Sequence, residues 1–286
     1  MSKVYSSPIK YAGAKRWLFR KIIKYLKNET IIVSPFVGGA TIELNLAMRG
    51  KKVLAYDADT DLVRFWNAYL TDCDKIISES KEILNNHSTT ELAEIKKKDN
   101  WRHDPTWFYI FNKLSYSNKP DNYVKKHYII ENEHYHIFKD GKPRRVFALS
   151  KNLLADRYKC LDLHIAESDF EDTLNNHKDI LAYCDPPYLT TEYLYSINKQ
   201  GFEHERLAEA LDKHQRWILS YNDHPAIREL YKGYRIIETN MLSTFRKNNK
   251  AVPKTELLIF SNSIDVDKYV TQPPKFKKEQ PCHFRP

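Results

Sequence analysis

Glycine is scarce in this chain, with only seven residues among 286, and three of the seven are Gly13, Gly38 and Gly39. The phosphate-binding pattern G-x-x-x-x-G-K-[ST] is absent, so a nucleoside triphosphate site is not indicated. The four cysteines form no C-x-x-C pair and have no histidine at zinc spacing. This spacing excludes the common structural zinc sites, favours reduced thiols and leads us to expect no metal.

Long apolar runs are also missing. No segment approaches membrane-spanning length, and the first residues, Met1 to Tyr5, do not read as a secretion signal. We therefore expect a cytoplasmic protein without a membrane partner. A length of 286 residues allows one large domain, or a main domain with an insert.

Positive charge is abundant, with a formal net charge of +9, and the excess is concentrated in one segment. Residues 96–159 contain 15 Lys and Arg against 7 Asp and Glu, interleaved with aromatic residues such as Trp101, Trp107 and Tyr123. Basic side chains attract a phosphate backbone, and aromatic rings stack on exposed bases. A solvated surface over a small aromatic core is the alternative, but the localised charge favours contact with nucleic acid.

Apolar periodicity predicts an α/β fold. Strands are expected at 31–33, 52–56, 163–166, 180–184, 217–221, 234–238 and 255–261, and helices at 15–27, 41–48, 203–214 and 225–231. Strands that alternate with helices indicate a parallel-rich sheet covered on both faces. We expect one domain in two pieces, 1–60 and 160–264, with a basic insert at 61–159 and a loose tail at 265–286.

The most informative motif is Asp185-Pro186-Pro187-Tyr188, directly after the buried strand. Pro187 forces Pro186 into an extended conformation and has no N–H, so the Pro186 carbonyl is presented without a donor beside it. The Asp185 carboxylate is a second acceptor, and Tyr188 offers a stacking face. An adenine amino group has two N–H donors, so the motif suits a planar base with an exocyclic amine. A strand-ending turn is the plainer alternative.

Three earlier segments suit a nucleoside-like cofactor. Gly38-Gly39 lies between a strand and a helix, where a backbone can approach a ligand closely. Asp57 ends the next strand, at the spacing of a carboxylate that receives ribose hydroxyls, and it also suits a cationic ligand such as a sulfonium. Lys10-Tyr11-Ala12-Gly13-Ala14-Lys15 is a small-residue turn that opens a helix, although surface lysines at a helix start explain it equally well.

The order of these segments resembles the Dam-type (D12 class) DNA adenine-N6 methyltransferases, which use S-adenosylmethionine. The resemblance runs from about residue 8 to 262 and weakens in 75–105 and 119–155. It rests on the following segments in one order: Tyr11–Lys15, Pro35–Gly39, Tyr56–Asp59, Phe111–Leu114, Ser168–Phe170, Asp185–Tyr188, Leu219–Asp223 and Lys254–Leu258.

The resemblance implies a Rossmann-like S-adenosylmethionine-dependent sheet and an inserted, mostly helical target-recognition domain that carries a β-hairpin. The residues that would surround the methyl donor are Tyr11, Gly13, Lys15, Phe36, Gly38, Gly39, Asp57, Asp169, Phe170 and Asp185. Among them, Asp57 would take the ribose hydroxyls, and Asp169 and Phe170 the adenine moiety of the donor. Asp185, Pro186, Pro187 and Tyr188 would hold the flipped target base of double-stranded DNA.

DNA contact is expected from residues of the insert: Phe111, Asn112, Lys113, Tyr116, Asn118, Arg144 and Arg145. Phe111 aligns with an aromatic residue that wedges between base pairs in the family. Family members that act on GATC read guanine with an arginine, where this chain has Tyr116. A tyrosine hydroxyl cannot form the two-pronged contact with guanine, so we expect a site other than GATC.

Other amino-methyltransferases share such motifs, so cytosine N4 and RNA adenine remain alternative substrates. A catalytically silent DNA-binding relative is a further alternative. We expect a monomer in a prokaryotic cell or a phage-infected host. The recognition sequence, a pairing with a restriction nuclease and the identity of the proton acceptor remain open.

Overall fold

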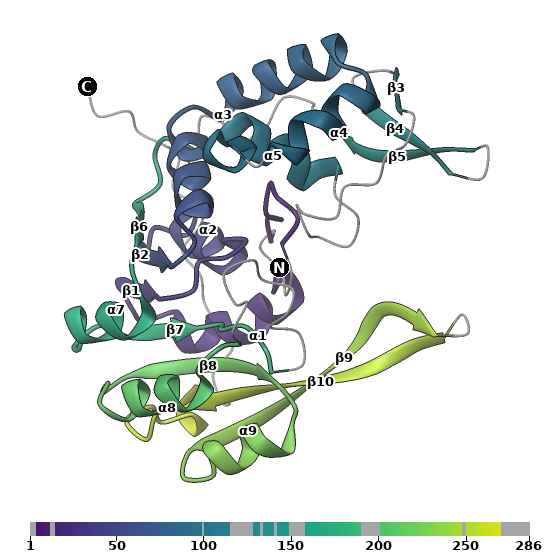
Figure 1. The fold of residues 1–286 in the computed structure, drawn as a ribbon. Helices are drawn as coiled ribbons and strands as arrows, with labels where there is room; N and C mark the ends of the chain where they lie inside the picture. Colours follow the sequence, from purple (N-terminus) through teal and green to yellow (C-terminus); the bar gives the residue numbers. More distant parts are fainter. Residues whose placement is uncertain are drawn as a thin grey trace.

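In the computed structural model, a seven-stranded sheet runs through the molecule in the order β6-β2-β1-β7-β8-β10-β9 (Figure 1). Its strands are β1 (Ile31–Ser34), β2 (Lys52–Asp57), β6 (Leu163–Glu167), β7 (Ala182–Cys184), β8 (Trp217–Asn222), β9 (Arg235–Lys247) and β10 (Lys250–Phe260). Neighbours from β6 to β8 pair in parallel, and β10 pairs antiparallel with both β8 and β9. The predicted parallel-rich sheet is confirmed.

The structure describes residues 4–11, 15–98, 100–114, 128–131, 134–139, 142–148, 158–189, 201–247 and 250–269. The helices are α1 (Arg16–Leu26), α2 (Thr41–Ala47), α3 (Thr60–Asn86), α4 (Thr89–Lys97), α5 (Pro105–Leu114), α7 (Phe170–Asn176), α8 (His204–Asp212) and α9 (Pro225–Leu230), with the 3-10 turns η1 (Asn100–His103) and η3 (Asp267–Tyr269). Each predicted helix and strand is present, with bounds shifted by a few residues. The largest shift is in β9, which continues well past its predicted end at 238.

Helix starts follow local sequence signals. Asp59 caps α3 by accepting hydrogen bonds from the N–H groups of Asp61 and Leu62. Ser88 and Glu91 form a reciprocal capping box at the start of α4. In α1, Leu18, Ile22 and other apolar residues three or four positions apart are buried against the core, as the period predicts.

The first helices of the predicted insert share their core with the sheet. Phe65 on α3 is fully buried, and its ring contacts Phe108 and Tyr109 on α5. The same apolar cluster includes Val53 on β2 and Ile165 on β6. No break in packing marks residue 61, and the division into a separate inserted domain stays a prediction.

Further along the insert, three antiparallel strands form a second sheet in the order β3-β4-β5. They are β3 (Tyr128–Glu131), β4 (His134–Lys139) and β5 (Lys142–Ala148). This sheet and the outer halves of β9 and β10 project from the same side of the molecule (Figure 1). Within the part of the chain described above, no helix is long and apolar enough to cross a membrane.

Strand order fixes where a ligand site is expected. From β1 the chain moves to β2 on one side, and later to β7 on the other side. Such a reversal of strand order opens a crevice outside the carboxyl ends of the two strands. The ends of β1, β2, β6 and β7 and the segments that follow them contain most of the predicted cofactor and base residues, so the site is expected in this crevice.

Candidate active site

A cavity of about 190 Å³ opens at the carboxyl ends of β1, β2, β6 and β7. The predicted site residues that line it are Tyr11, Lys15, Phe36, Gly38, Gly39, Asp57, Asp169, Phe170, Asp185 and Pro187. Gly13 lies outside the described residues. Segments distant in the sequence therefore meet at one cavity, as a shared site for methyl donor and base requires.

The glycine turn is held between Tyr11 and Asp57. The Gly38 N–H donates to Asp57 Oδ2 at 2.9 Å, and the Asp59 N–H donates to Asp57 Oδ1 at 3.1 Å. A Cβ on Gly38 would lie 2.9 Å from the Tyr11 ring, and a Cβ on Gly39 would lie 2.9 Å from Tyr11 Cβ. Gly38 also has a φ of +44°, so only glycine fits without strain. Burial raises the pKa of Asp57 to about 6, against the opposing effect of these N–H donors.

Asp185 forms an ion pair with a buried lysine. Lys15 Nζ lies 2.9 Å from Asp185 Oδ1, and the lysine and aspartate side chains are 3% and 20% exposed. The Ser220 hydroxyl on β8 donates to the same Asp185 oxygen at 2.8 Å. Burial raises the pKa of Asp185, and the Lys15 ammonium opposes that rise. The carboxylate is thus held by two donors that enter from different elements.

Tyr188 is less accessible than the sequence predicts. Its ring is 5% exposed, stacks on Tyr221 at a centroid distance of 5.4 Å, and has the Lys15 ammonium 4.5 Å from its centroid. Its hydroxyl donates to Glu256 Oε2 at 3.1 Å. Tyr188 and Pro186 are absent from the cavity lining. Lys15 and Tyr221 therefore cover the ring in this conformation, and the stacking of a base on Tyr188 stays a prediction.

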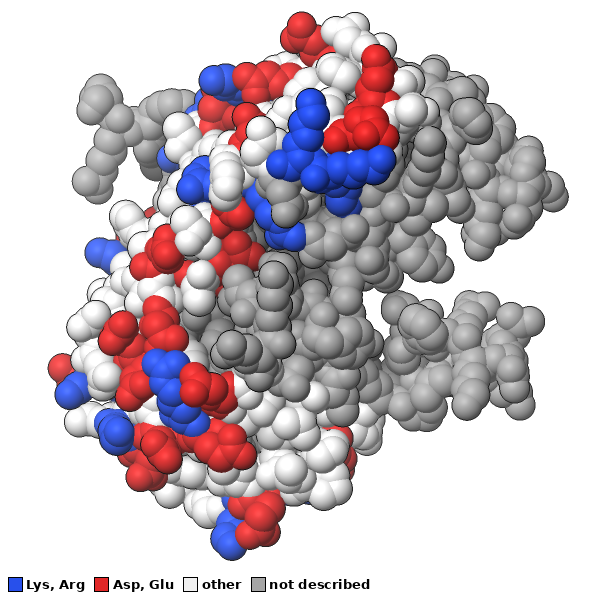
Figure 2. Space-filling model, in the orientation of Figure 1, with Lys and Arg blue, Asp and Glu red and all other residues white. Residues whose placement is uncertain are grey.

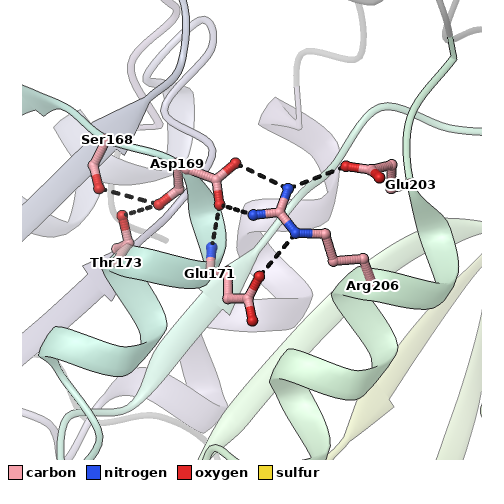
Figure 3. Close-up of polar contacts among 6 residues, drawn as sticks. All are labelled: Ser168, Asp169, Glu171, Thr173, Glu203 and Arg206. Atoms are coloured by element: carbon pink, nitrogen blue, oxygen red, sulfur yellow. Dashed lines mark hydrogen bonds and ion pairs between the residues drawn. The ribbon is translucent and has the colours of Figure 1, made fainter.

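Asp169 is occupied by an arginine that the sequence did not single out. Figure 3 shows Arg206 of α8 reaching Asp169, Glu171 and Glu203, with its Nη2 2.6 Å from Asp169 Oδ1. The same Asp169 oxygen accepts the Glu171 N–H at 2.9 Å and so caps α7. The Arg206 guanidinium also lies 4.6 Å from the centre of the Phe170 ring. Arg206 therefore ties α7 to α8 at the rim of the cavity.

Aromatic rings form one wall of the cavity. Phe36 after β1, Phe170 at the start of α7 and Phe202 before α8 lie within 5.6–5.8 Å of one another by ring centroids. Flat apolar rings suit a purine, and the strand-end carboxylate of Asp57 suits ribose hydroxyls. The residues present therefore fit the adenosine part of S-adenosylmethionine.

Glu43 is a further acid in the cavity wall. This residue of α2 is 3% exposed and accepts a hydrogen bond from the Ser34 hydroxyl at 2.7 Å. Burial raises its pKa to about 7, against the opposing hydrogen bond from Ser34. Sequence reasoning missed it, along with Tyr183, Phe202, Glu203 and Arg206. A charged residue among the apolar positions of α2 was the available signal.

Two predicted DNA contacts in α5 are buried instead. Phe111 is fully buried between Trp101 and Trp107, with centroid distances of 5.0 and 5.6 Å. Asn112, also fully buried, accepts the Lys10 N–H at 2.7 Å and donates to the Lys10 carbonyl at 2.6 Å. Both side chains are thus packed inside in this conformation, and the wedge role of Phe111 and the DNA contact of Asn112 stay predictions.

The other predicted DNA contacts are only partly described. Lys113 is half-buried, and burial lowers its pKa to about 8. Tyr116 and Asn118 lie outside the described residues. Arg144 and Arg145 lie on β5, where they pair with Ile137 and His136 of β4. Figure 2 shows basic side chains next to acidic ones on the upper part of the molecule, over the helices of the insert.

No group of three or more His, Cys, Asp and Glu suited to a metal ion occurs among the residues that the structure describes.

Comparison with known proteins identifies a family. A family model described as D12 class N6 adenine-specific DNA methyltransferase matches residues 11–245. The DNA adenine methylase of Vibrio cholerae is 25% identical over 279 residues, covering 88% of this chain and 94% of the relative. That of Escherichia coli K12 is 24% identical over 282 residues, with 88% and 93% coverage. Among solved structures, a Geobacter metallireducens precorrin-6y methyltransferase aligns at 9% identity with a TM-score of 0.39, covering 90% of this chain and 100% of its own, too distant to bear on function.

Replacing Lys15 with methionine should destabilise the protein more at pH 8 than at pH 5. Without Lys15, the pKa of Asp185 rises further, so ionised Asp185 carries an uncompensated cost that protonation removes as the pH falls. We expect a loss of about 2 kcal/mol at pH 8, below the 3–5 kcal/mol of fully buried pairs because Asp185 is partly exposed. Urea unfolding at both pH values measures it.

The double variant Lys15→Met/Asp185→Asn serves as the control for this pair. It should recover most of the stability lost at pH 8, because no ionised carboxylate is left unpaired. Equal losses at both pH values, or losses that simply add in the double variant, would show that the two residues are not coupled.

Proposed function

Since the chain belongs to the D12 class N6 adenine-specific DNA methyltransferase family, it methylates DNA adenine with S-adenosylmethionine, and we propose that transfer occurs in the cavity between β1 and β7. The observation that carries this proposal is the shared lining. Asp57, Gly38 and Asp185 come from three separate strand ends and meet around one space. A donor site and a base site must adjoin for a methyl group to pass directly from one to the other.

Bound S-adenosylmethionine supplies an electrophilic methyl group on a positively charged sulfur. We assign the ribose hydroxyls to Asp57, whose carboxylate is fixed by the Gly38 and Asp59 N–H groups. The adenine of the donor is assigned to the wall of Phe36, Phe170 and Phe202. Because Asp169 is already held by Arg206, we assign it a role in shaping this wall.

The target adenine is assigned to Asp185. Its amino nitrogen is a poor nucleophile because the lone pair is delocalised into the ring. An Asp185 carboxylate and a neighbouring carbonyl accept the two N–H bonds, fix the amine and favour a more pyramidal nitrogen. As the methyl group transfers, positive charge develops on this nitrogen, and the Asp185 carboxylate stabilises it.

Lys15 would exchange with the base at Asp185. In the structure its ammonium both pairs with Asp185 and covers the Tyr188 ring. A base amine that donates to Asp185 replaces the lysine as donor, and a displaced Lys15 uncovers Tyr188 for stacking. The base thus gains its platform as it gains its hydrogen bonds, while Tyr221 and Glu256 hold the tyrosine from behind.

Recognition of the DNA is assigned to the insert. Its second sheet projects from the same side of the molecule as the outer halves of β9 and β10 (Figure 1), and we propose that a duplex meets both. Tyr116 replaces the guanine-reading arginine of GATC enzymes, so we propose a target sequence other than GATC. Sequencing of methylated DNA identifies that target.

Asp185→Asn should lower the methyl-transfer rate by on the order of 10²–10³-fold, because the amide cannot stabilise the charge that develops on nitrogen. Binding of S-adenosylmethionine should be largely retained. Single-turnover transfer of a radiolabelled methyl group to DNA measures the rate, and nucleoside analysis of the product should give N6-methyladenine.

Asp179→Asn is the matched control, since Asp179 is exposed in the loop just before β7. It should transfer at the wild-type rate. Wild-type turnover by Asp185→Asn, or a product methylated on cytosine, would contradict the assignment of the target adenine to Asp185.

Charge reversal of Arg144 and Arg145 to glutamate should weaken DNA binding and flatten its salt dependence. For each phosphate that the protein no longer neutralises, the slope of log K against log salt falls in magnitude by about 0.9. Fluorescence anisotropy across a salt series gives both quantities. The control is charge reversal of Lys178 and Lys213, exposed residues that follow α7 and α8. It changes the net charge as much as the arginine variant does, but should leave the salt slope nearer the wild-type value. Equal effects from both pairs would place the arginines off the DNA path.

A further inference from the structure

Glu43 is a buried acid that the stability of the fold does not require. It lies on α2 with its side chain 3% exposed, and it lines the cavity. Among the described residues, the Ser34 hydroxyl is the side chain that donates a hydrogen bond to Glu43. In the part of the chain that the structure describes, no ion pair joins Glu43 to a basic residue. A buried charge without a partner destabilises a protein, so a position that retains one calls for a functional reason.

The polar groups that act on Glu43 from other elements come from the ends of three strands. Ser34 ends β1, Asp57 ends β2, Asp185 follows β7, and both carboxylates act on Glu43 electrostatically. Tyr183 of β7 also lines the cavity and is acted on by Glu43. The cavity lining also contains Lys15, whose ammonium pairs with Asp185 at 2.9 Å, and Arg206, which pairs with Asp169 at 2.6 Å.

This arrangement leaves the cavity with more negative than positive charge once its acids ionise. Burial, more than the nearby Asp185 and Asp57, raises the pKa of Glu43 to about 7, so the empty cavity keeps a proton on Glu43 at neutral pH for much of the time. A cationic ligand beside the carboxylate would favour the ionised form and expel that proton.

We propose that Glu43 is the counter-charge for the positive charge of the methyl donor, so that donor binding at neutral pH releases a proton from Glu43. The inference rests on the proposed function, in which this cavity binds S-adenosylmethionine. That donor carries two cationic groups, a sulfonium and an α-ammonium. Transfer of the methyl group turns the sulfonium into a neutral thioether and leaves the ammonium unchanged.

The consequence differs for the two cationic groups. If Glu43 faces the sulfonium, it favours the donor over the product S-adenosylhomocysteine and so assists product release. If it faces the ammonium, it contributes equally to the affinity for the donor and for the product. In both cases the affinity for the donor rises as the pH rises through the titration of Glu43.

Isothermal titration calorimetry of the full chain with S-adenosylmethionine tests the proposal. At pH 7, titrations in buffers of different ionisation enthalpy count the protons released. The wild type should release a fraction of a proton. Glu43→Gln keeps an oxygen that accepts from Ser34 but has no proton to release, and it should bind the donor at least about tenfold more weakly. Glu209→Gln, at an exposed position on α8, should match the wild type.

Thermal unfolding of the ligand-free protein separates this role from a structural one. Because folding raises the pKa of Glu43 from 4.5 to about 7, the wild type loses stability as the pH rises between these two values, and the loss levels off above the folded pKa. Glu43→Gln should therefore be more stable than the wild type at pH 8, with a smaller difference at pH 6. A purely structural glutamate would make this variant less stable at both pH values.

The outcomes distinguish the proposed function from the role of Glu43. Failure of the wild type to bind S-adenosylmethionine would overturn the proposed function itself. Wild-type binding with equal affinity and equal proton release in Glu43→Gln would overturn only the role of Glu43. A greater loss of affinity for S-adenosylmethionine than for S-adenosylhomocysteine assigns Glu43 to the sulfonium, and an equal loss of both assigns it to the ammonium.

Discussion

Parallel pairing of β1 with β2 on one side and with β7 on the other is the constraint on which the site depends. Val33 pairs with Leu54 in one neighbour and with Ala182 in the other, so the three strands end at the same edge. Asp57 is the last residue of β2, Asp185 follows β7 directly, and the glycine turn comes shortly after β1. A slip of one residue would turn alternate side chains to the opposite face of the sheet and separate the two carboxylates.

The electrostatics of the cavity follow from that placement. Asp57 and Glu43 are buried with pKa values raised to about 6 and 7, and Asp185 is paired with the buried Lys15. Such a group of acids is costly for the empty protein, and perturbed carboxyls gathered in one cavity are typical of a functional site. In the proposed account, a ligand with positive charge on its sulfur reduces this cost when it binds. The same groups that destabilise the fold would then give it an affinity for the methyl donor.

Features set by short stretches of sequence were predictable. The strand that ends at Asp57, the turn at Gly38 and the strand before Asp185 depend on local apolar runs and on glycine, and the structure has them where the sequence indicates. The family, too, was recognisable from the order of these segments. Their meeting at one cavity followed from the parallel sheet that the alternation of strands and helices predicts.

Features set by packing between distant elements were not predictable. The family resemblance predicts that Phe111 wedges between base pairs, yet Trp101 of η1 packs against its ring. Tyr188 reads as an open ring, yet Tyr221 and Lys15 occupy its faces. Arg206 binds Asp169 only because α8 packs beside α7. In each case the contacting residue lies on another helix, strand or turn. The apolar periodicity along the chain therefore does not predict the contact.

The central claim is that methyl donor and target base meet at the end of β7. The measurement that tests it most directly is a crystal structure of the chain with S-adenosylhomocysteine and a duplex that contains its target. The account predicts ribose hydroxyls on Asp57, an extruded adenine with its amine on Asp185, and Lys15 displaced from that carboxylate. A ligand bound away from the glycine turn, or an adenine bound far from Asp185, would contradict the account.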